Sequence, residues 1–196
     1  MAEIVLVRHG QTEWSRLGRH TGRTDIPLSA AGRRQAGALV AALAGMPFTR
    51  VLTSPLSRAT ESCRLAGLAD HAEPYDALME WDYGGYEGRT TEEICRERPS
   101  WVLWRDGVPQ GETADQVAAR LDPLLAELRR ADGDVAIFAH GHVLRVLAAR
   151  WLGLPAMDGR LFALAPATVS VLGWERETAV ILRWNQPSPA DAPPTV

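Results

Sequence analysis

Residues 4–10 read IVLVRHG, a continuous apolar run that ends directly at an arginine, a histidine and a glycine. Continuous rather than alternating apolar residues indicate a strand that is buried on both faces, as in a parallel sheet covered by helices. Residues 135–142 read VAIFAHGH and repeat the pattern, and residues 51–53 give a shorter case. Helical patterns separate these segments. The order predicts an α/β fold, a three-layer α/β/α sandwich around a mostly parallel sheet.

Four amphipathic segments predict the helices between the strands. Ser29 is a suitable N-cap for the first, and Ser54 followed by a proline is a suitable start for the second. The third has its apolar face over residues 117–128, with a proline inside that predicts a kink or a fresh start. The fourth runs over residues 143–151 and should end at Gly153.

The last part of the chain reads as a closing hairpin followed by a tail. Residues 167–174 and 178–184 alternate in the manner of two antiparallel strands. Residues 186–196 are Pro-rich and poor in side chains that could pack, so we expect a disordered tail there. The chain has 196 residues, enough for one domain with a full core, and we expect a single domain over residues 1–185.

Composition and charge argue against several classes of protein. The formal net charge is -3, without the basic stripe that nucleic-acid binding would need. No apolar run approaches the roughly 20 residues of a membrane span. The start of the sequence lacks a signal-peptide pattern, so we expect a cytoplasmic protein. Cys63 and Cys95 lack metal-ligand spacing and are interpreted as two reduced thiols.

Side chains with catalytic potential follow three of the predicted strands. Arg8 and His9 come directly after the first strand, Arg58 lies early in the helix after the second, and His140 follows the third. Because the carboxyl ends of parallel strands share one edge, where open α/β sheets bind ligands, we expect these side chains to share one cleft. Arginines beside helix N-termini suit an oxyanion, most naturally a phosphate.

A zinc site is the rival interpretation of the same histidines. His9, His140 and His142 could supply nitrogen ligands, but the neighbouring arginines would repel a cation, and no carboxylate or cysteine accompanies them at suitable spacing. We therefore expect no metal and no cofactor. The expected partner is a small-molecule phosphate ester, with neither nucleic acid nor membrane, and a homodimer is left open.

Five phrases of the sequence, in order and spread over nearly the whole chain, carry a family resemblance. They are LVRHGQTEW at 6–14, TG at 21–22 with DIPL at 25–28, SPLSRA at 54–59, EWDYGGYEG at 80–88 and AHG at 139–141. On these motifs the chain resembles the histidine phosphatase superfamily, the phosphoglycerate mutase-like enzymes, and this implies a phosphoglycerate mutase-like fold. Residues 14–22 are similar to the acid phosphatase and sugar-bisphosphatase members.

The resemblance implies that His9 is a nucleophile that takes up the phosphoryl group as a phosphohistidine. It must then be neutral, with one ring nitrogen donating to a backbone carbonyl so that the other keeps its lone pair. Arg8, Arg58 and His140 would surround the phosphoryl oxygens, and Glu80 would protonate the leaving group and later activate water. Substrate contacts or support for these residues are expected from Gly10, Gln11, Glu13, Ser15, Thr21, Gly22, Tyr83 and Gly141.

Two positions depart from the glycolytic mutases of the family. Ser15 and His142 stand where those enzymes have asparagine. The chain is also short and lacks a long basic insertion, and a compact site that admits water favours hydrolysis. We therefore expect a phosphatase for small phosphate monoesters, such as sugar phosphates or phosphoglycerate-like metabolites. A phosphoglycerate mutase and an inactive module that binds phosphorylated ligands stay open as alternatives.

A second phosphate on the substrate would need a second group of cations. Candidates in the sequence are Arg16, Arg19, Arg23 and Arg89. We prefer the interpretation that all four are solvated surface residues.

Overall fold

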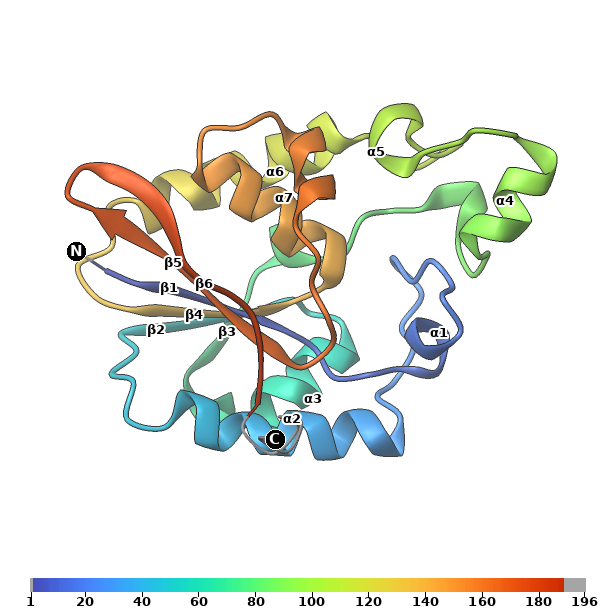
Figure 1. Cartoon of the computed structure of the whole chain (residues 1–196). Coiled ribbons are helices and arrows are strands. Elements are labelled where there is room, and N and C mark those ends of the chain that lie inside the picture. The colour runs from blue at the N-terminus through green and yellow to red at the C-terminus, as the bar shows by residue number, and fades with distance from the viewer. Residues whose placement is uncertain (1, 189–196) are drawn as a thin grey trace, which may run out of the picture.

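In the computed structural model, which describes residues 2–188, six strands form one mixed sheet in the order β3-β2-β4-β1-β5-β6 (Figure 1). The strands are β1 (Ile4–Arg8), β2 (Arg50–Thr53), β3 (Ala72–Pro74), β4 (Val135–Ala139), β5 (Thr168–Glu175) and β6 (Thr178–Pro187). The first four run parallel to one another, whereas β5 is antiparallel to β1 and β6 is antiparallel to β5.

The two central strands are the continuous apolar runs of the sequence. β1 pairs with β4 from Ile4 opposite Val135 to Arg8 opposite Ala139. The apolar residues of both strands are buried, because neighbouring strands cover their edges and helices cover both faces of the sheet. The prediction of a largely parallel sheet in an α/β fold is confirmed.

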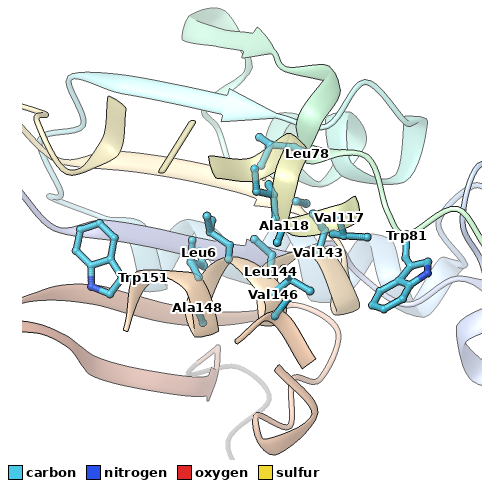
Figure 2. Close-up of a cluster of buried hydrophobic side chains, with 14 of the residues drawn as sticks. Leu6, Leu78, Trp81, Val117, Ala118, Val143, Leu144, Val146, Ala148 and Trp151 are labelled. Atoms are coloured by element: carbon cyan, nitrogen blue, oxygen red, sulfur yellow. The ribbon is translucent and has the colours of Figure 1, made fainter. Parts of the chain in front are cut away.

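Helices pack on both faces of the sheet (Figure 1). Those on one face are α2 (Ala30–Leu43) and α3 (Ser57–Leu65), and those on the other are α6 (Ala114–Leu128) and α7 (Gly141–Trp151). Since side chains alternate across a strand, β1 contributes to both cores. Val5 and Val7 pack with Leu39 of α2, whereas Ile4 and Leu6 belong to the cluster with α6 and α7 (Figure 2). The three-layer sandwich is confirmed.

Most helix termini lie where the sequence places them. Ser29 is the N-cap of α2, and its side chain accepts the N–H of Gly32 at 3.0 Å. α7 ends before Gly153, whose φ of 75° suits a residue that follows a helix. α6 passes through Pro123 without a fresh start.

One predicted helix start is wrong. α3 begins at Ser57, with Leu56 at the N-cap position, and not at Ser54. The Ser54 hydroxyl is hydrogen-bonded to Nε2 of His140 at 2.7 Å, and its local contact, with the Leu56 N–H, is longer at 3.4 Å. The local sequence predicts that the Ser54 hydroxyl caps α3, but its shorter hydrogen bond is to a residue far away in the chain.

The sequence patterns do not predict β3 or several short elements. These are α1 (Glu13–Arg16), α4 (Thr91–Glu97), α5 (Leu103–Asp106) and the 3-10 helices η1 (Ala69–His71), η2 (Asp76–Leu78), η3 (Gly84–Tyr86) and η4 (Ala156–Leu161). The helices α1, α4 and α5 lie beyond the carboxyl ends of the parallel strands (Figure 1). They therefore lie at the edge where this class of sheet binds ligands.

The closing hairpin is confirmed, and the expected boundary of the tail needs correction. β5 and β6 pair antiparallel, and β6 continues to Pro187, so the expected tail at 186–196 begins too early. The pairing of Pro187 with Thr168 and the hydrogen bond from Ser188 Oγ to the Ala38 carbonyl, at 2.7 Å, hold these residues to the domain. Residues 189–196 lie outside the described residues.

Two further expectations concern the thiols and the membrane. Cys63 is buried and Cys95 is half-buried, both as free thiols, and burial raises the pKa of Cys63 to about 12. Between residues 2 and 188, no helix combines the length and the apolar character that crossing a bilayer demands.

Candidate active site

The predicted convergence of histidines and arginines at the sheet edge is confirmed. The rings of His9 and His140 have centroids 5.1 Å apart, and Nε of Arg58 donates to Nδ1 of His140 at 3.1 Å. These residues follow β1, β4 and β2, the three neighbouring parallel strands at the centre of the sheet.

His9 is held as a neutral imidazole with a defined tautomer. Its Nδ1 lies 2.6 Å from the carbonyl oxygen of Gly10; because a carbonyl only accepts, Nδ1 carries the proton and Nε2 keeps its lone pair. Burial, followed by the charges of Arg58 and Arg8, lowers the pKa of His9 well below its ordinary value. Both features are those that the sequence predicts for a nucleophile.

Gly10 is required by close packing of the segment after β1. A Cβ atom at this position would lie 2.3 Å from the carbonyl oxygen of Gly32 in α2. Its N–H donates to Ser62 Oγ at 3.1 Å. The next residue, Gln11, accepts the Ser29 N–H at 2.9 Å through its carbonyl. Gly10 and Gln11 therefore fix His9 against α2 and α3.

Arg58 is fully buried, and each of its three side-chain nitrogens donates to at least one protein acceptor. Nη1 donates to the Thr24 carbonyl at 3.0 Å, and Nη2 to the carbonyls of Gly22 and Thr21 at 2.8 and 3.3 Å. Its Nε always carries a proton and donates to Nδ1 of His140, so Nδ1 must be the acceptor. Nε2 of His140 then carries the proton and donates to Ser54 Oγ at 2.7 Å.

Arg8 has a free donor beside the same histidines. One of its terminal nitrogens donates to the Leu164 carbonyl, while Nε is buried without a hydrogen-bond partner in the part of the chain that the structure describes. The guanidinium also lies against Gly141, where a Cβ atom would be 3.2 Å from Cζ of Arg8. Burial lowers the pKa of Arg8, and Glu80 and Tyr83 oppose this shift. Because burying a donor without a hydrogen bond costs free energy, an anionic acceptor next to this guanidinium would stabilise the site.

Glu80 accepts three backbone N–H groups. Trp81 N–H and Val143 N–H donate to Oε1 at 3.0 and 2.9 Å, and His142 N–H donates to Oε2 at 3.0 Å. Two of these donors belong to the first turn of α7, where the helix dipole also favours a negative charge. The carboxyl group is therefore fixed in position at the cavity wall.

Tyr83 and His142 form a second fixed pair. The Tyr83 hydroxyl lies 2.6 Å from Nδ1 of His142, and both side chains face the cavity. Burial raises the pKa of Tyr83 well above, and lowers that of His142 well below, their ordinary values. Nearby, burial lowers the pKa of His20 to about 4. All three groups are neutral hydrogen-bonding residues around pH 7.

A cavity of about 280 Å³ opens beside these groups. Among the predicted site residues, those that line it are Arg8, His9, Ser15, Thr21, Glu80, Tyr83 and Gly141. Other residues that line it are Gly18, Arg19, His20, Thr91, His142, Arg145 and Leu164. The volume is near the lower end for ligand pockets, about 300 Å³, and suits a small metabolite.

The remaining predicted residues do not line the cavity, and most of them support the residues that do. Arg58 and His140 are buried next to His9, so their contact with a phosphoryl group stays a prediction. Gly22 donates its N–H to Glu87 at 2.7 Å. Glu13 is exposed and pairs with Arg16 at 2.6 Å. Glu13 therefore serves helix α1 in this structure.

Three of the four arginines considered for a second anion site have a carboxylate within 4.0 Å. Arg16 pairs with Glu13 and Arg89 with Glu97, each at 2.6 Å. Arg23 lies 4.0 and 3.9 Å from Asp82 and Glu112. Arg19 differs, since it lines the cavity and donates to the Gly88 carbonyl at 2.5 Å.

Arg145 is a cavity residue that sequence reasoning missed. Its position four residues after Gly141 places it on the same face of α7, so the helical spacing could have identified it.

Across residues 2–188 there is no group of three or more His, Cys, Asp or Glu side chains placed to hold a metal ion. The geometry around His140 gives a reason, since both of its ring nitrogens are engaged, by Arg58 and by Ser54. The charged groups on the cavity wall are Arg8, Arg19, Arg145 and Glu80. This balance favours an anionic ligand.

Comparisons with known proteins agree with this chemistry. The family model described as the histidine phosphatase superfamily (branch 1) matches residues 4–187. An acid phosphatase of Mycobacterium tuberculosis is 40% identical over 197 residues, covering 96% of each chain. A sedoheptulose 1,7-bisphosphatase of Saccharomyces cerevisiae is 39% identical over 183 residues, which cover 76% of this chain and 67% of that protein.

Solved structures give the same fold. The structure of an open reading frame of Mycobacterium tuberculosis superposes with a TM-score of 0.91 at 36% identity, covering 95% of this chain and 98% of that one. A mycobacterial glucosyl-3-phosphoglycerate phosphatase, solved with VO3, gives a TM-score of 0.85 at 28% identity, covering 95% of this chain and 100% of that one.

Proposed function

The chain belongs to the histidine phosphatase superfamily (branch 1), and from this we propose that it hydrolyses small phosphate monoesters, sugar phosphates or phosphoglycerate-like metabolites, through a phosphohistidine on His9. One observation carries the proposal. His9 is buried and neutral, with Nδ1 donating to the Gly10 carbonyl at 2.6 Å, so that Nε2 is available to attack phosphorus.

In the first step Nε2 of His9 attacks the phosphorus atom in line with the ester oxygen. The P–N bond forms as the P–O bond breaks, and the departing alkoxide takes a proton from Glu80. A phosphate monoester has a second pKa of about 6, so it can bring this proton as its monoanion and pass it to Glu80. The support for this role is that Glu80 is fixed in the cavity wall by three backbone N–H groups.

In the second step Glu80 removes a proton from a water molecule, whose oxygen attacks the phosphorus. The P–N bond breaks, inorganic phosphate leaves, and His9 regains its lone pair on Nε2 with Nδ1 still bound to Gly10. Protein donors would stabilise the charge on the transferring group throughout. In Arg8, which lines the cavity, Nη2 has no hydrogen-bond partner among residues 2–188 and is not one of the fully buried atoms, so it is the donor we assign to this purpose.

We further propose that the enzyme needs no metal ion and resembles the acid phosphatases of the family in its specificity. The support for metal independence is the cationic site: Arg8 and Arg58 lie beside the two histidines and supply the positive charge that a metal ion provides in other enzymes. The support for the specificity is the acid phosphatase that is 40% identical to this chain. A cytoplasmic location stays a prediction, which cell fractionation would test, and light scattering would decide between a monomer and a homodimer.

Phosphate release from p-nitrophenyl phosphate in excess EDTA tests the proposal. We expect turnover that EDTA leaves unchanged and that His9→Ala abolishes. Loss of activity in EDTA with recovery on adding a divalent cation would refute metal independence. Conversion of phosphoglycerates without net phosphate release would identify a mutase instead. Binding of phosphate esters without any phosphate release would identify an inactive binding module.

A further inference from the structure

Arg145 lies one helical turn along α7 from the residue that contacts Arg8. It lies on α7 four residues after Gly141, whose backbone touches the guanidinium of Arg8. Residues four apart on a helix have Cβ atoms about 5–6 Å apart on the same face. Both residues line the cavity. Arg145 therefore lines the same cavity as Arg8 and His9, about one helical turn further along its wall.

The guanidinium of Arg145 is held in place before any ligand binds. Nε donates to the Gly159 carbonyl at 3.0 Å and Nη2 to the Arg160 carbonyl at 3.2 Å. Its Cζ lies 4.8 Å from the ring centroid of Trp104, in a cation–π arrangement. Two hydrogen bonds and a stacked ring remove most of the side-chain freedom that binding would otherwise have to restrict.

One donor edge of Arg145 is left over. Among residues 2–188, Nη1 has no hydrogen-bond partner, and it is not one of the fully buried atoms without a partner, so it is accessible on a side chain that lines the cavity. No carboxylate of the described chain lies within 4.0 Å of this guanidinium, whereas Arg150 on the same helix pairs with Asp122 at 3.1 Å. Burial lowers the pKa of Arg145. The charge of Glu80 partly opposes this shift, but no carboxylate of residues 2–188 is in contact with the Arg145 guanidinium.

The positive charges of the site exceed what one phosphoryl group can balance. Arg8, Arg19 and Arg145 line the cavity, Arg58 is buried beside His9, and Glu80 is the acidic residue among those that line the cavity, which gives a formal charge of about +3. A phosphoryl group of charge about -2 leaves about one positive charge over. Arg19 has an acidic neighbour, because its charge helps to lower the pKa of Glu93, so Arg145 is the better candidate for a second anionic group.

We propose that Arg145 binds a second anionic group of the substrate, a carboxylate or a second phosphate located a few bonds from the phosphoryl group. The inference rests on the proposed function and narrows its substrates to phosphate esters that carry another negative charge. In these substrates the forked guanidinium sets KM and orientation, while transfer to His9 is unchanged.

Two pairs of substrates that differ in one charged group test the inference. Glycerol 3-phosphate and 3-phosphoglycerate differ by a carboxylate, and fructose 6-phosphate and fructose 1,6-bisphosphate differ by a phosphate. We expect the wild-type enzyme to prefer the more anionic member of at least one pair. In Arg145→Gln, kcat/KM for that member should fall by at least about tenfold more than for its partner, mainly through KM. The pair that responds identifies the group.

Arg129 supplies a matched control at the other end of α7. It is the C-cap residue of α6, and it donates to the carbonyls of Arg150 and Trp151 and lies 5.9 Å from the Trp151 ring centroid. It therefore shares the carbonyl hydrogen bonds and the cation–π contact of Arg145, but it is more exposed and does not line the cavity. Arg129→Gln should leave the ratio of kcat/KM values within each pair unchanged. An equal loss on both members of each pair in Arg145→Gln would show a structural role and overturn the inference.

Results for Arg145→Lys and for the wild-type enzyme also test the inference. If Arg145→Gln fails to fold, Arg145→Lys, which keeps the charge without the fork, should reduce the same preference by a smaller factor; an unchanged preference would overturn the inference. A wild-type enzyme that hydrolyses p-nitrophenyl phosphate but prefers neither anionic substrate would overturn the inference and leave the proposed function standing. A wild-type enzyme that releases phosphate from no ester would refute the proposed function itself.

Discussion

Replacing Arg58 by alanine should destabilise the protein as well as inactivate it. The side chain is fully buried and donates to three backbone carbonyls in the segment 21–24 and to Nδ1 of His140. Each acceptor left unpaired in the interior costs about 1–3 kcal/mol. Removing a buried cation recovers part of this, because the desolvation of its charge is no longer needed.

The balance gives an expected loss of about 3–5 kcal/mol in the free energy of unfolding, the range found when one partner of a buried charged network is removed. For a chain of this size that corresponds to a decrease in Tm of roughly 6–20 °C. Urea unfolding followed by tryptophan fluorescence would measure the first quantity and calorimetry the second.

Arg64 provides the comparison on the same helix. Its side chain is 62% exposed and lies 3.9 Å from Glu61, so Arg64→Ala should cost less than about 0.5 kcal/mol. If the losses in the free energy of unfolding for Arg58→Ala and Arg64→Ala agreed within about 1 kcal/mol, the hydrogen bonds of Arg58 would not stabilise the segment 21–24, and the reasoning would be refuted.

Two further predictions concern the stability of the protein at acidic pH and the packing of the backbone at Gly10. Burial lowers the pKa of four histidines: His9, His20, His140 and His142. Below their ordinary value of about 6.5 the unfolded chain binds the protons that the folded protein refuses. Stability should therefore decrease as the pH falls from 6.5 to 5, by up to about 1.4 kcal/mol per pH unit for each histidine, and a urea midpoint that stays constant over this window would contradict the assignment. Gly10→Ala, whose Cβ would lie 2.3 Å from the Gly32 carbonyl oxygen, should cost about 3 kcal/mol. A Cβ atom at Gly37 in α2 would meet open space, so Gly37→Ala should stabilise the protein by about 0.5–1 kcal/mol. If thermal denaturation gave the same change in Tm for Gly10→Ala and Gly37→Ala, the close contact at Gly10 would not be costly and the prediction would be wrong.

The strands and the meeting of the catalytic groups could be predicted from the sequence because both follow from local pattern. Residues 4–7 and 135–139 are apolar without alternation, which fixes a strand covered on both faces. Once those strands are parallel, topology alone brings His9 and His140 to one edge. The neutral tautomer of His9 was also predictable, since the chemistry requires it and Gly10 supplies the carbonyl.

What could not be predicted depends on contacts between distant segments. Ser54 has the local pattern of an N-cap, yet its hydroxyl is bound to His140, 86 residues later in the chain. β3 is three residues long and contains a glutamate and a proline, so it has no strand pattern of its own and forms by pairing with β2. The cavity residues His20 and Thr91 come from segments between the strands, where periodicity carries no information about position.

Trapping the covalent intermediate tests the central claim most directly. The enzyme would be quenched in alkali during turnover of a substrate radiolabelled on phosphorus, digested, and its peptides analysed by mass spectrometry. The account predicts one phosphoryl group on the peptide that contains His9, stable in alkali, lost in acid and absent from His9→Asn. A phosphoryl group on any other residue, or full phosphatase activity in His9→Asn, would contradict it.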